Sequence, residues 1–288
     1  MKQNKIFFGA IIIGIVACCA FVLLGNRNTM TQEKVVLFID SDSRVECKEI
    51  VIEDCRDKCI DYCKDKETLL FVNSKNQIVE RNIAGEEQIM NVEAVDLTET
   101  VSNVQYGPYD DSIYFIYENE IYQYSLNDKV VTKKTDGIGS NWRRTFIWKN
   151  DEYGYKLVDN GKFSELYSMD MNENLEQKIC EGWIQSIGQA QENKIYALEV
   201  YSNAVHDSSM AGLCNRIIAI DISNGNTEIV QEIGGWMDGN YLFVCNGDDI
   251  FYIQKKKKKE YLYKVNLSTG LKEKIYSTRN KVIGLAVN

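Results

Sequence analysis

The chain has 288 residues, which is enough for one large domain built from strands. It contains 17 tyrosines and a single proline, a composition that suits short pleated strands better than long helices or disorder. Lys2, Lys5 and Arg27 precede residue 31, so the net charge of −9 at pH 7 becomes −12 for the rest of the chain. Such an acidic domain repels nucleic acid, and we exclude nucleic acid as a partner.

The N-terminal segment predicts a membrane anchor. Residues 6–24 form an uncharged apolar run, close to the ~20 residues with which a helix crosses the hydrocarbon core. Lys2 and Lys5 precede this run, and by the positive-inside bias residues 1–5 are a cytoplasmic tail. We therefore expect a single-pass protein of the cell membrane, with residues 25–288 outside the cytoplasm.

A lipid anchor is the alternative to this transmembrane helix. The segment that ends in Cys18, Ile-Val-Ala-Cys, resembles a bacterial lipobox, which would make Cys18 the lipidated residue of a cleaved lipoprotein. The apolar run continues from residue 19 to residue 24, where a mature lipoprotein usually becomes polar. We therefore favour the uncleaved anchor, followed by a polar linker at residues 25–34.

Two strands and a cysteine-rich segment open the folded domain. Residues 35–40 and 45–52 alternate as strands do. Three cysteines follow at intervals of four and would line one face of a helix, and with a fourth they could form two disulfides; the four are Cys47, Cys55, Cys59 and Cys63. Since neither a CxxC spacing nor a histidine accompanies them, we expect no metal site. A bond between Cys180 and Cys214 is a further option.

A six-residue pattern then recurs five times. It begins at residues 78, 121, 166, 217 and 262, and its copies read IVERNI, IYQYSL, LYSMDM, IIAIDI and LYKVNL. A period of ~40 to 50 residues with about four strands per unit is typical of a β-propeller blade. The fifth position of each copy is Asn82, Ser125, Asp170, Asp221 or Asn266, and Gly or Asn follows at residues 85, 174, 225 and 270. These residue types predict hairpin turns.

The two ends of the domain predict a sixth blade. Residues 282–287 resemble the first strand of a blade, and residues 35–52 supply strands that lack a first one. Joining them would close the ring and leave no unpaired edge. We therefore expect an all-β, six-bladed β-propeller at residues 35–288, preceded by one transmembrane helix.

The repeat resembles the bacterial extracytoplasmic propellers of the TolB-like, quinoprotein-repeat-like group, whose blades read (I/L)-Y-x-(V/I)-(D/N)-x-x-x-G. The resemblance covers about residues 68–288 and implies a propeller fold in the cell envelope. Quinoprotein repeats carry a tryptophan at a fixed place in each blade, and this chain does not repeat one. We therefore expect no quinone, and no other cofactor.

Several unusual segments should share one face of the propeller. Loop 201–216 holds the one histidine of the chain, and consecutive His-Asp-Ser residues on a loop rarely converge as a catalytic triad. The lysine run should be a hairpin tip that is either merely solvated or attracts anions. The tryptophans either pack between blades or form an apolar platform. The candidate ligand-binding residues are His206, Asp207, Lys255, Lys256, Lys257, Lys258, Lys259, Trp142, Trp183 and Trp236.

These features favour a binding or assembly module of the cell envelope without catalytic residues, whose partner is an envelope protein or a cell-wall glycan. The alternative is a glycan hydrolase or lyase that uses carboxylates in the axial funnel. The acidic pairs at residues 110–111 and 248–249 read as turn residues. A sensor that signals through its anchor is a third hypothesis, and Gly9 and Gly14 are not spaced as the GxxxG helix-packing motif requires.

Overall fold

The structure is a computed structural model of the chain, which divides into two compact units, Met1–Glu33 and Lys34–Asn288. The residues that it describes are 33–41, 44–56, 60–90, 92, 101–107, 111–135, 145–148, 153–160, 163–170, 173, 175–202, 213–235 and 242–288. Within these ranges there is no helix that could cross a membrane. The predicted anchor at residues 6–24 lies outside them.

The second unit is built from strands alone in its described part, and they form six sheets. Five sheets have four strands each in sequence order, and we number them as blades along the chain. Blade 1 comprises β3 (Asp61–Cys63), β4 (Thr68–Val72), β5 (Ile78–Asn82) and β6 (Glu87–Ile89); blade 2 comprises β7 (Ser102–Tyr106), β8 (Ser112–Tyr117), β9 (Glu120–Ser125) and β10 (Val131–Thr135); blade 3 comprises β11 (Phe146–Trp148), β12 (Tyr153–Asp159), β13 (Ser164–Asp170) and β14 (Leu175–Gly182). Blade 4 comprises β15 (Ile184–Gln191), β16 (Lys194–Ser202), β17 (Leu213–Asp221) and β18 (Thr227–Gly235), and blade 5 comprises β19 (Phe243–Asn246), β20 (Asp249–Lys256), β21 (Lys259–Asn266) and β22 (Lys272–Thr278).

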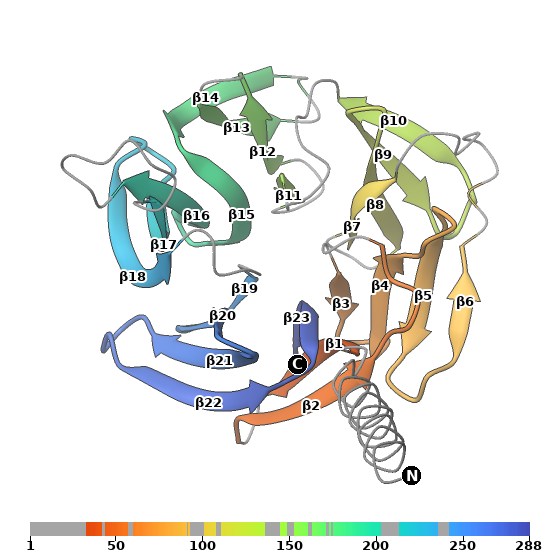
Figure 1. Cartoon of the computed structure of the whole chain (residues 1–288). Helices are drawn as coiled ribbons and strands as arrows, with labels where there is room; N and C mark the ends of the chain where they lie inside the picture. The colour runs from red at the N-terminus through yellow and green to blue at the C-terminus, as the bar shows by residue number, and fades with distance from the viewer. Residues whose placement is uncertain are drawn as a thin grey trace, which may run out of the picture. The chain divides into compact units, whose positions relative to one another are not determined.

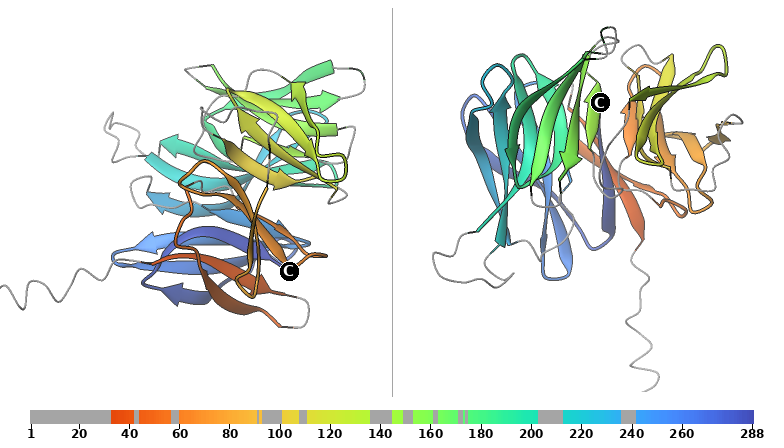
Figure 2. Two further views of the ribbon diagram at one scale, coloured as in Figure 1. Left: turned by 90° about the vertical axis from the view of Figure 1, so that its right-hand side faces the viewer. Right: turned by 90° about the horizontal axis from the view of Figure 1, so that it is seen from above.

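The sixth sheet joins the two ends of the domain. Blade 6 places β1 (Lys34–Asp40) between β2 (Glu46–Val51) and β23 (Lys281–Val287). Figure 1 shows the six sheets around a common axis, with β3, β7, β11, β15, β19 and β23 nearest to it, and Figure 2 shows the same blades from two other sides. The predicted six-bladed, all-β ring closed by both chain ends is confirmed.

The closing blade differs from the others in one respect that the sequence does not reveal. β1 pairs with β23 in parallel, with Val35 opposite Val282 and Ile39 opposite Val287, whereas each of the other strand pairs in the described sheets is antiparallel. The blade has three strands instead of four, because it lacks the strand that would run antiparallel to β23 beside it. The inner strand β23 therefore lies next to β1, which runs in the same direction. No hairpin connects the two, and this allows the parallel arrangement.

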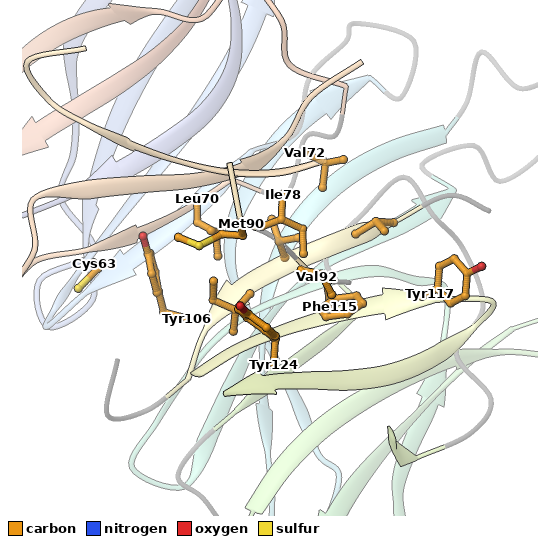
Figure 3. Packing of buried hydrophobic residues seen from close by; sticks show 13 residues of the cluster. Cys63, Leu70, Val72, Ile78, Met90, Val92, Tyr106, Phe115, Tyr117 and Tyr124 are labelled. Atoms are coloured by element: carbon orange, nitrogen blue, oxygen red, sulfur yellow. The ribbon is translucent and has the colours of Figure 1, made fainter. Parts of the chain in front are cut away.

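A separate apolar cluster fills each of the six interfaces between neighbouring blades. β20 shows how the sequence achieves this, because Ile250 and Tyr252 pack toward blade 4 while Phe251 and Ile253 pack toward blade 6. A strand buried on both faces has to be apolar at every position. Figure 3 shows the cluster between blades 1 and 2, where Leu70 and Ile78 meet residues of β7 and β8. Burying one such side chain stabilises the fold by roughly 1.5–3 kcal/mol.

Side-chain hydrogen bonds also join neighbouring inner strands. The Asp61 carboxylate accepts the Tyr106 N–H at 2.8 Å, and the Asn103 amide oxygen accepts the Thr145 N–H at 2.8 Å. The Asn246 amide donates to the Asn288 carbonyl at 3.2 Å. These bonds connect blade 1 to blade 2, blade 2 to blade 3, and blade 5 to blade 6, so they fix the order of the ring from inside.

The predicted turns are confirmed at all five repeat positions. In each, the side-chain oxygen of the Asn, Ser or Asp accepts a backbone N–H two to four residues further on. The bonds run from Glu86 to Asn82 (2.9 Å), from Asp128 to Ser125 (3.1 Å), from Glu173 to Asp170 (3.1 Å), from Ser223 to Asp221 (2.8 Å) and from Thr269 to Asn266 (3.0 Å). Gly225 and Gly270 have φ of 72° and 67°, a conformation in which glycine carries no steric cost.

Candidate functional site

The propeller has one face on which the second strand of each blade ends and the third begins, and we call it the loop face. The end of β16 at Ser202, the start of β17 at Leu213, and the turn at Lys257 and Lys258 between β20 and β21 belong to this face by their place in the topology. The fourth strand of a blade also ends there, so the links between blades share it. For the lysine turn this is the face expected from the sequence, while most of loop 201–216 lies outside the described residues.

Several candidate residues fall outside the described ranges. These are Cys18, Cys59, Trp142, Trp236, His206 and Asp207. Their predicted roles stay predictions.

Trp183 lies in the link between β14 and β15, and half of its surface (50%) is exposed. Its ring centroid is 6.4 Å from that of Phe163, at a tilt of 55°. Its carbonyl accepts the N–H of Val200 at 3.0 Å, which fixes the backbone. The indole therefore presents an open side on a fixed backbone, as a ligand platform requires.

The lysine run is a hairpin tip, as predicted. Lys255 and Lys256 end β20, Lys257 and Lys258 form the turn, and Lys259 begins β21. Lys257 has φ of 57°, the left-handed conformation typical of a tight hairpin. Four of the five, Lys256 to Lys259, are exposed, and Lys255 is half-buried.

A row of tyrosines continues from this tip along the side of blade 5 that faces blade 4. Tyr252 and Tyr263 lie opposite each other on β20 and β21, and their rings stack with centroids 5.4 Å apart. Tyr252 is fully buried in the cluster between blades 4 and 5, and Tyr263 packs against the same cluster. Tyr261 also belongs to this side, since it lies opposite Gln254, two positions along from Tyr252.

Lysine ammonium groups lie over these rings. The Lys272 Nζ is 4.5 Å from the centroid of Tyr263 and 5.2 Å from that of Tyr252. The Lys256 Nζ lies 5.6 Å from the Tyr263 centroid and donates to its hydroxyl at 3.4 Å. The Lys274 Nζ is 5.8 Å from the Tyr261 centroid. Partial burial, and then the positive charge of Lys256, lower the pKa of Lys272.

The sequence analysis missed Lys272, Lys274 and the tyrosines, although a signal was present. Counting back from the turn at residues 268–270 puts Lys272 opposite Val265 and Lys274 opposite Tyr263, as the structure has them. Strand register could therefore have extended the lysine run into a larger basic surface.

The cysteine-rich segment is not helical at its described residues, 55–56 and 60–63, so the prediction of a helix is wrong there. Residues 61–63 form β3, because the inner strand of blade 1 has to pair with β4. Cys63 is buried between blades 1 and 2, and Cys55 between blades 6 and 1. Cys47, Cys180 and Cys214 have free thiols, so the structure has neither a bond between Cys180 and Cys214 nor one at Cys47.

Two of these thiols, Cys47 and Cys180, are partly buried. Burial raises the pKa of Cys47 and of Cys180 to about 11, so both are protonated at neutral pH. Among the residues that the structure describes, no group of His, Cys, Asp and Glu is arranged to hold a metal ion.

One acidic side chain lies on the described inner strands. It is Asp61, whose carboxylate accepts the Tyr106 N–H. Asp248 and Asp249 lie at the β19–β20 turn, where Asp248 accepts the Ser268 hydroxyl at 3.0 Å and Asp249 forms an ion pair with Lys264 at 2.6 Å. These are the structural roles expected of turn residues. Asp110 lies outside the described ranges.

Comparison with known proteins identifies the fold. No protein-family model and no curated protein matches the chain. Solved structures do match: a TolB from Agrobacterium tumefaciens, described as putative in its own report, has a TM-score of 0.61 at 12% identity over 85% of this chain and 89% of that one. A chain of a nidogen/laminin complex has 0.59 at 9% identity, over 86% and 95%. The β-propeller domain of the trilobed protease from Pyrococcus furiosus has 0.53 at 10% identity, over 89% and 87%.

At 9–12% identity these likenesses concern the fold alone. The chain is therefore a six-bladed β-propeller with a TolB-like fold.

Proposed function

We propose that this protein is a binding or assembly module of a bacterial cell envelope, without catalytic activity, held at the outer side of the cytoplasmic membrane by residues 6–24. The observation that carries the proposal is the basic, tyrosine-rich side of blade 5, which begins at the lysine tip on the loop face and whose ammonium groups lie over aromatic rings. Exposed cations and aromatic groups at loop ends of a rigid ring suit the capture of a partner.

The similar structures support a binding role. TolB proteins have the same fold, and one of the similar chains comes from a complex between two proteins, nidogen and laminin. The half-exposed Trp183 adds an apolar contact of the kind that partner proteins and sugars use. The partner is an envelope protein or a cell-wall glycan.

The alternative, a glycan hydrolase or lyase, has less support. A hydrolase of this kind needs two carboxylates about 5 to 9 Å apart near the axis. The described inner strands supply Asp61 alone, and it already bonds to the backbone of the next blade. No feature of the described residues favours this activity.

The test is a retention experiment with the full chain in a non-ionic detergent. We expect the immobilised protein to retain a specific envelope protein or cell-wall polymer from an extract of the cells that produce it. The control is residues 1–33 fused to an unrelated soluble domain, which separates binding by the propeller from binding by the anchor. If the protein retained nothing beyond the control and cleaved a panel of glycans, the proposal would be wrong.

The anchoring has its own test. Protease added to intact spheroplasts should digest the propeller, since we place it outside the cytoplasmic membrane. A Cys18→Ser variant should stay in the membrane fraction, because the uncleaved helix needs no lipid. Release of this variant into the soluble fraction would show that Cys18 carries the anchor instead.

A further inference from the structure

We propose that the side of blade 5 that faces blade 4 binds the phosphodiester groups of an anionic polymer. The residues are Lys256, Tyr261, Tyr263, Lys272 and Lys274, which we call the lysine–tyrosine strip. The inference rests on the proposed function, because the protein meets such a polymer only if it lies in the cell envelope. The binding itself can be tested with the purified protein.

Charge is the first observation. Between residues 243 and 278 there are eight lysines and four acidic residues, a net charge of +4. The rest of the chain from residue 31 onwards then carries −16. A basic blade in an otherwise acidic ring concentrates anions at one place and repels them elsewhere.

A comparison with blades 2 and 3 is the second and strongest observation. Lys133 in blade 2 and Lys178 in blade 3 lie opposite Tyr122 and Tyr167, and Lys274 in blade 5 lies opposite Tyr263 in the same register. In blades 2 and 3 a glutamate two residues before the tyrosine neutralises the lysine. These ion pairs are Lys133 with Glu120 at 2.6 Å and Lys178 with Glu165 at 2.7 Å.

Blade 5 has Tyr261 at the position of that glutamate. The Lys274 ammonium lies over the Tyr261 ring and forms no ion pair with a carboxylate of the described part of the chain. Across the described residues, neither Lys256 nor Lys272 forms an ion pair with a carboxylate either. The lysine at this position is therefore neutralised in blades 2 and 3 and not neutralised in blade 5. The cause is the tyrosine that blade 5 has in place of the glutamate.

The strip is arranged on one side of the sheet. Lys272 lies opposite Val265 and Lys274 opposite Tyr263, so both project to the side of Tyr263. All three lysines of the strip are exposed, while the rings beneath them are half-buried or buried. The aromatic faces hold the ammonium groups in place without removing their charge, which leaves them ready to bind an anion.

Lysine is a point charge with three rotatable donors, and it is a common ligand of phosphate groups. Several separated cations along a strip suit repeated charges on one polymer. A flat anionic bilayer would also face the acidic remainder of the domain, which carries −16, whereas a flexible polymer can follow the strip alone. We therefore favour a polymer over a membrane surface.

The experiment measures binding of poly(glycerol phosphate) to the full chain in a non-ionic detergent by isothermal titration calorimetry. The variant Lys256→Gln/Lys272→Gln/Lys274→Gln should weaken binding about tenfold or more and reduce the salt dependence of the dissociation constant. The matched control is Lys133→Gln/Lys178→Gln/Lys194→Gln, which removes the same charge from three lysines that form ion pairs with glutamates. The control should bind within about twofold of the natural protein, because neutralised lysines add little to an external contact.

A second variant keeps every lysine. Tyr261→Glu restores the glutamate of blades 2 and 3, and it should weaken binding by giving Lys274 an internal partner. Circular dichroism verifies that each variant is folded. Equal loss in the control triple variant would overturn the proposal, and so would equally tight binding of polygalacturonate, a carboxylate polymer.

Vesicles separate the two sources of phosphodiester. Binding to phosphatidylglycerol vesicles, without binding to the polymer, would overturn the polymer as the ligand. Failure of this inference can also be told apart from failure of the proposed function. Retention of an envelope partner that is insensitive to the lysine variants would leave the binding module intact and refute the strip.

Discussion

Gly284 of β23 packs so closely against Ile60 that a β-carbon at position 284 would lie 2.8 Å from Ile60 Cδ1 and 3.1 Å from its Cβ. Ile60 belongs to the cluster between blades 6 and 1, where the chain ends meet. We predict that Gly284→Ala lowers the free energy of unfolding by about 1–3 kcal/mol, because overpacking forces neighbours out of their preferred rotamers. Urea unfolding followed by circular dichroism measures it.

A second variant tests the cause. Ile60→Ala removes the Cδ1 that makes the closest of these contacts, so adding Gly284→Ala to this background should cost less than it does alone. Equal costs in the two backgrounds would show that the strain comes from elsewhere.

The sequence predicts most of this fold because the repeat is local. Each copy carries its own apolar alternation and its own Asn, Ser or Asp turn, and five copies at a period of ~40 to 50 residues suffice to indicate blades. The missing pieces at the two ends then imply a sixth blade. The parallel pairing of Val35 with Val282 is not predictable in this way, because no turn joins these strands and the period says nothing about direction at the seam.

The candidate site was predicted only in part. The lysine tip is visible because the residues are consecutive, whereas Lys274 and Tyr261 are thirteen residues apart and meet only through the register of two strands. The predicted helix with Cys55 and Cys63 failed for a related reason. A spacing of four residues suggests a helix, but the pairing of β3 with β4 determines the structure at Cys63.

The hydrogen bond from the Tyr106 N–H to the Asp61 carboxylate supports the second prediction. Asp61→Ala leaves this buried N–H without its acceptor and should lower the free energy of unfolding by about 1–3 kcal/mol. Asp61→Asn keeps an oxygen acceptor and should cost less. Asp65→Ala, in the exposed turn before β4, serves as the control and should stay within about 0.5 kcal/mol of the natural protein. Urea titration of the three variants decides, and equal effects at residues 61 and 65 would contradict the role of this bond.

The third prediction concerns alkaline pH. Burial, together with the hydrogen bond that its hydroxyl donates to Glu80 at 2.7 Å, raises the pKa of Tyr106 well above its ordinary value. A group whose pKa is higher in the folded state stabilises the protein fully below its unfolded pKa, near ~10 for tyrosine, and loses this contribution as pH rises above that value. The free energy of unfolding should therefore fall between pH 10 and pH 11.5, at about 1.4 kcal/mol per pH unit for each such tyrosine.

Tyr106→Phe should reduce the slope of this decline by the contribution of one tyrosine. It should also lower the stability at neutral pH, because it removes the hydrogen bond to Glu80. Tyr261→Phe is the matched control, since it removes a hydroxyl from a half-buried tyrosine that bonds to no glutamate in the described structure. Urea unfolding at a series of pH values measures both slopes. An unchanged slope for Tyr106→Phe would mean that Tyr106 ionises in the folded protein as readily as in the unfolded one.

The fourth prediction is a stabilising change. Asn215 on β17 is fully buried, lies on the side of Ile217 between blades 4 and 5, and its amide has no hydrogen-bond partner among the described residues. An unpaired buried amide costs free energy, so Asn215→Leu, which keeps the branching of the side chain, should raise the free energy of unfolding by about 1 kcal/mol. Asn103→Leu is the contrast, because the Asn103 oxygen accepts the Thr145 N–H at 2.8 Å and its φ of 54° disfavours leucine. It should destabilise the protein. Thermal unfolding of both variants gives the sign of each effect, and a lower melting temperature for Asn215→Leu would show that this amide is satisfied in the native protein, for instance by a buried water that bridges the two blades.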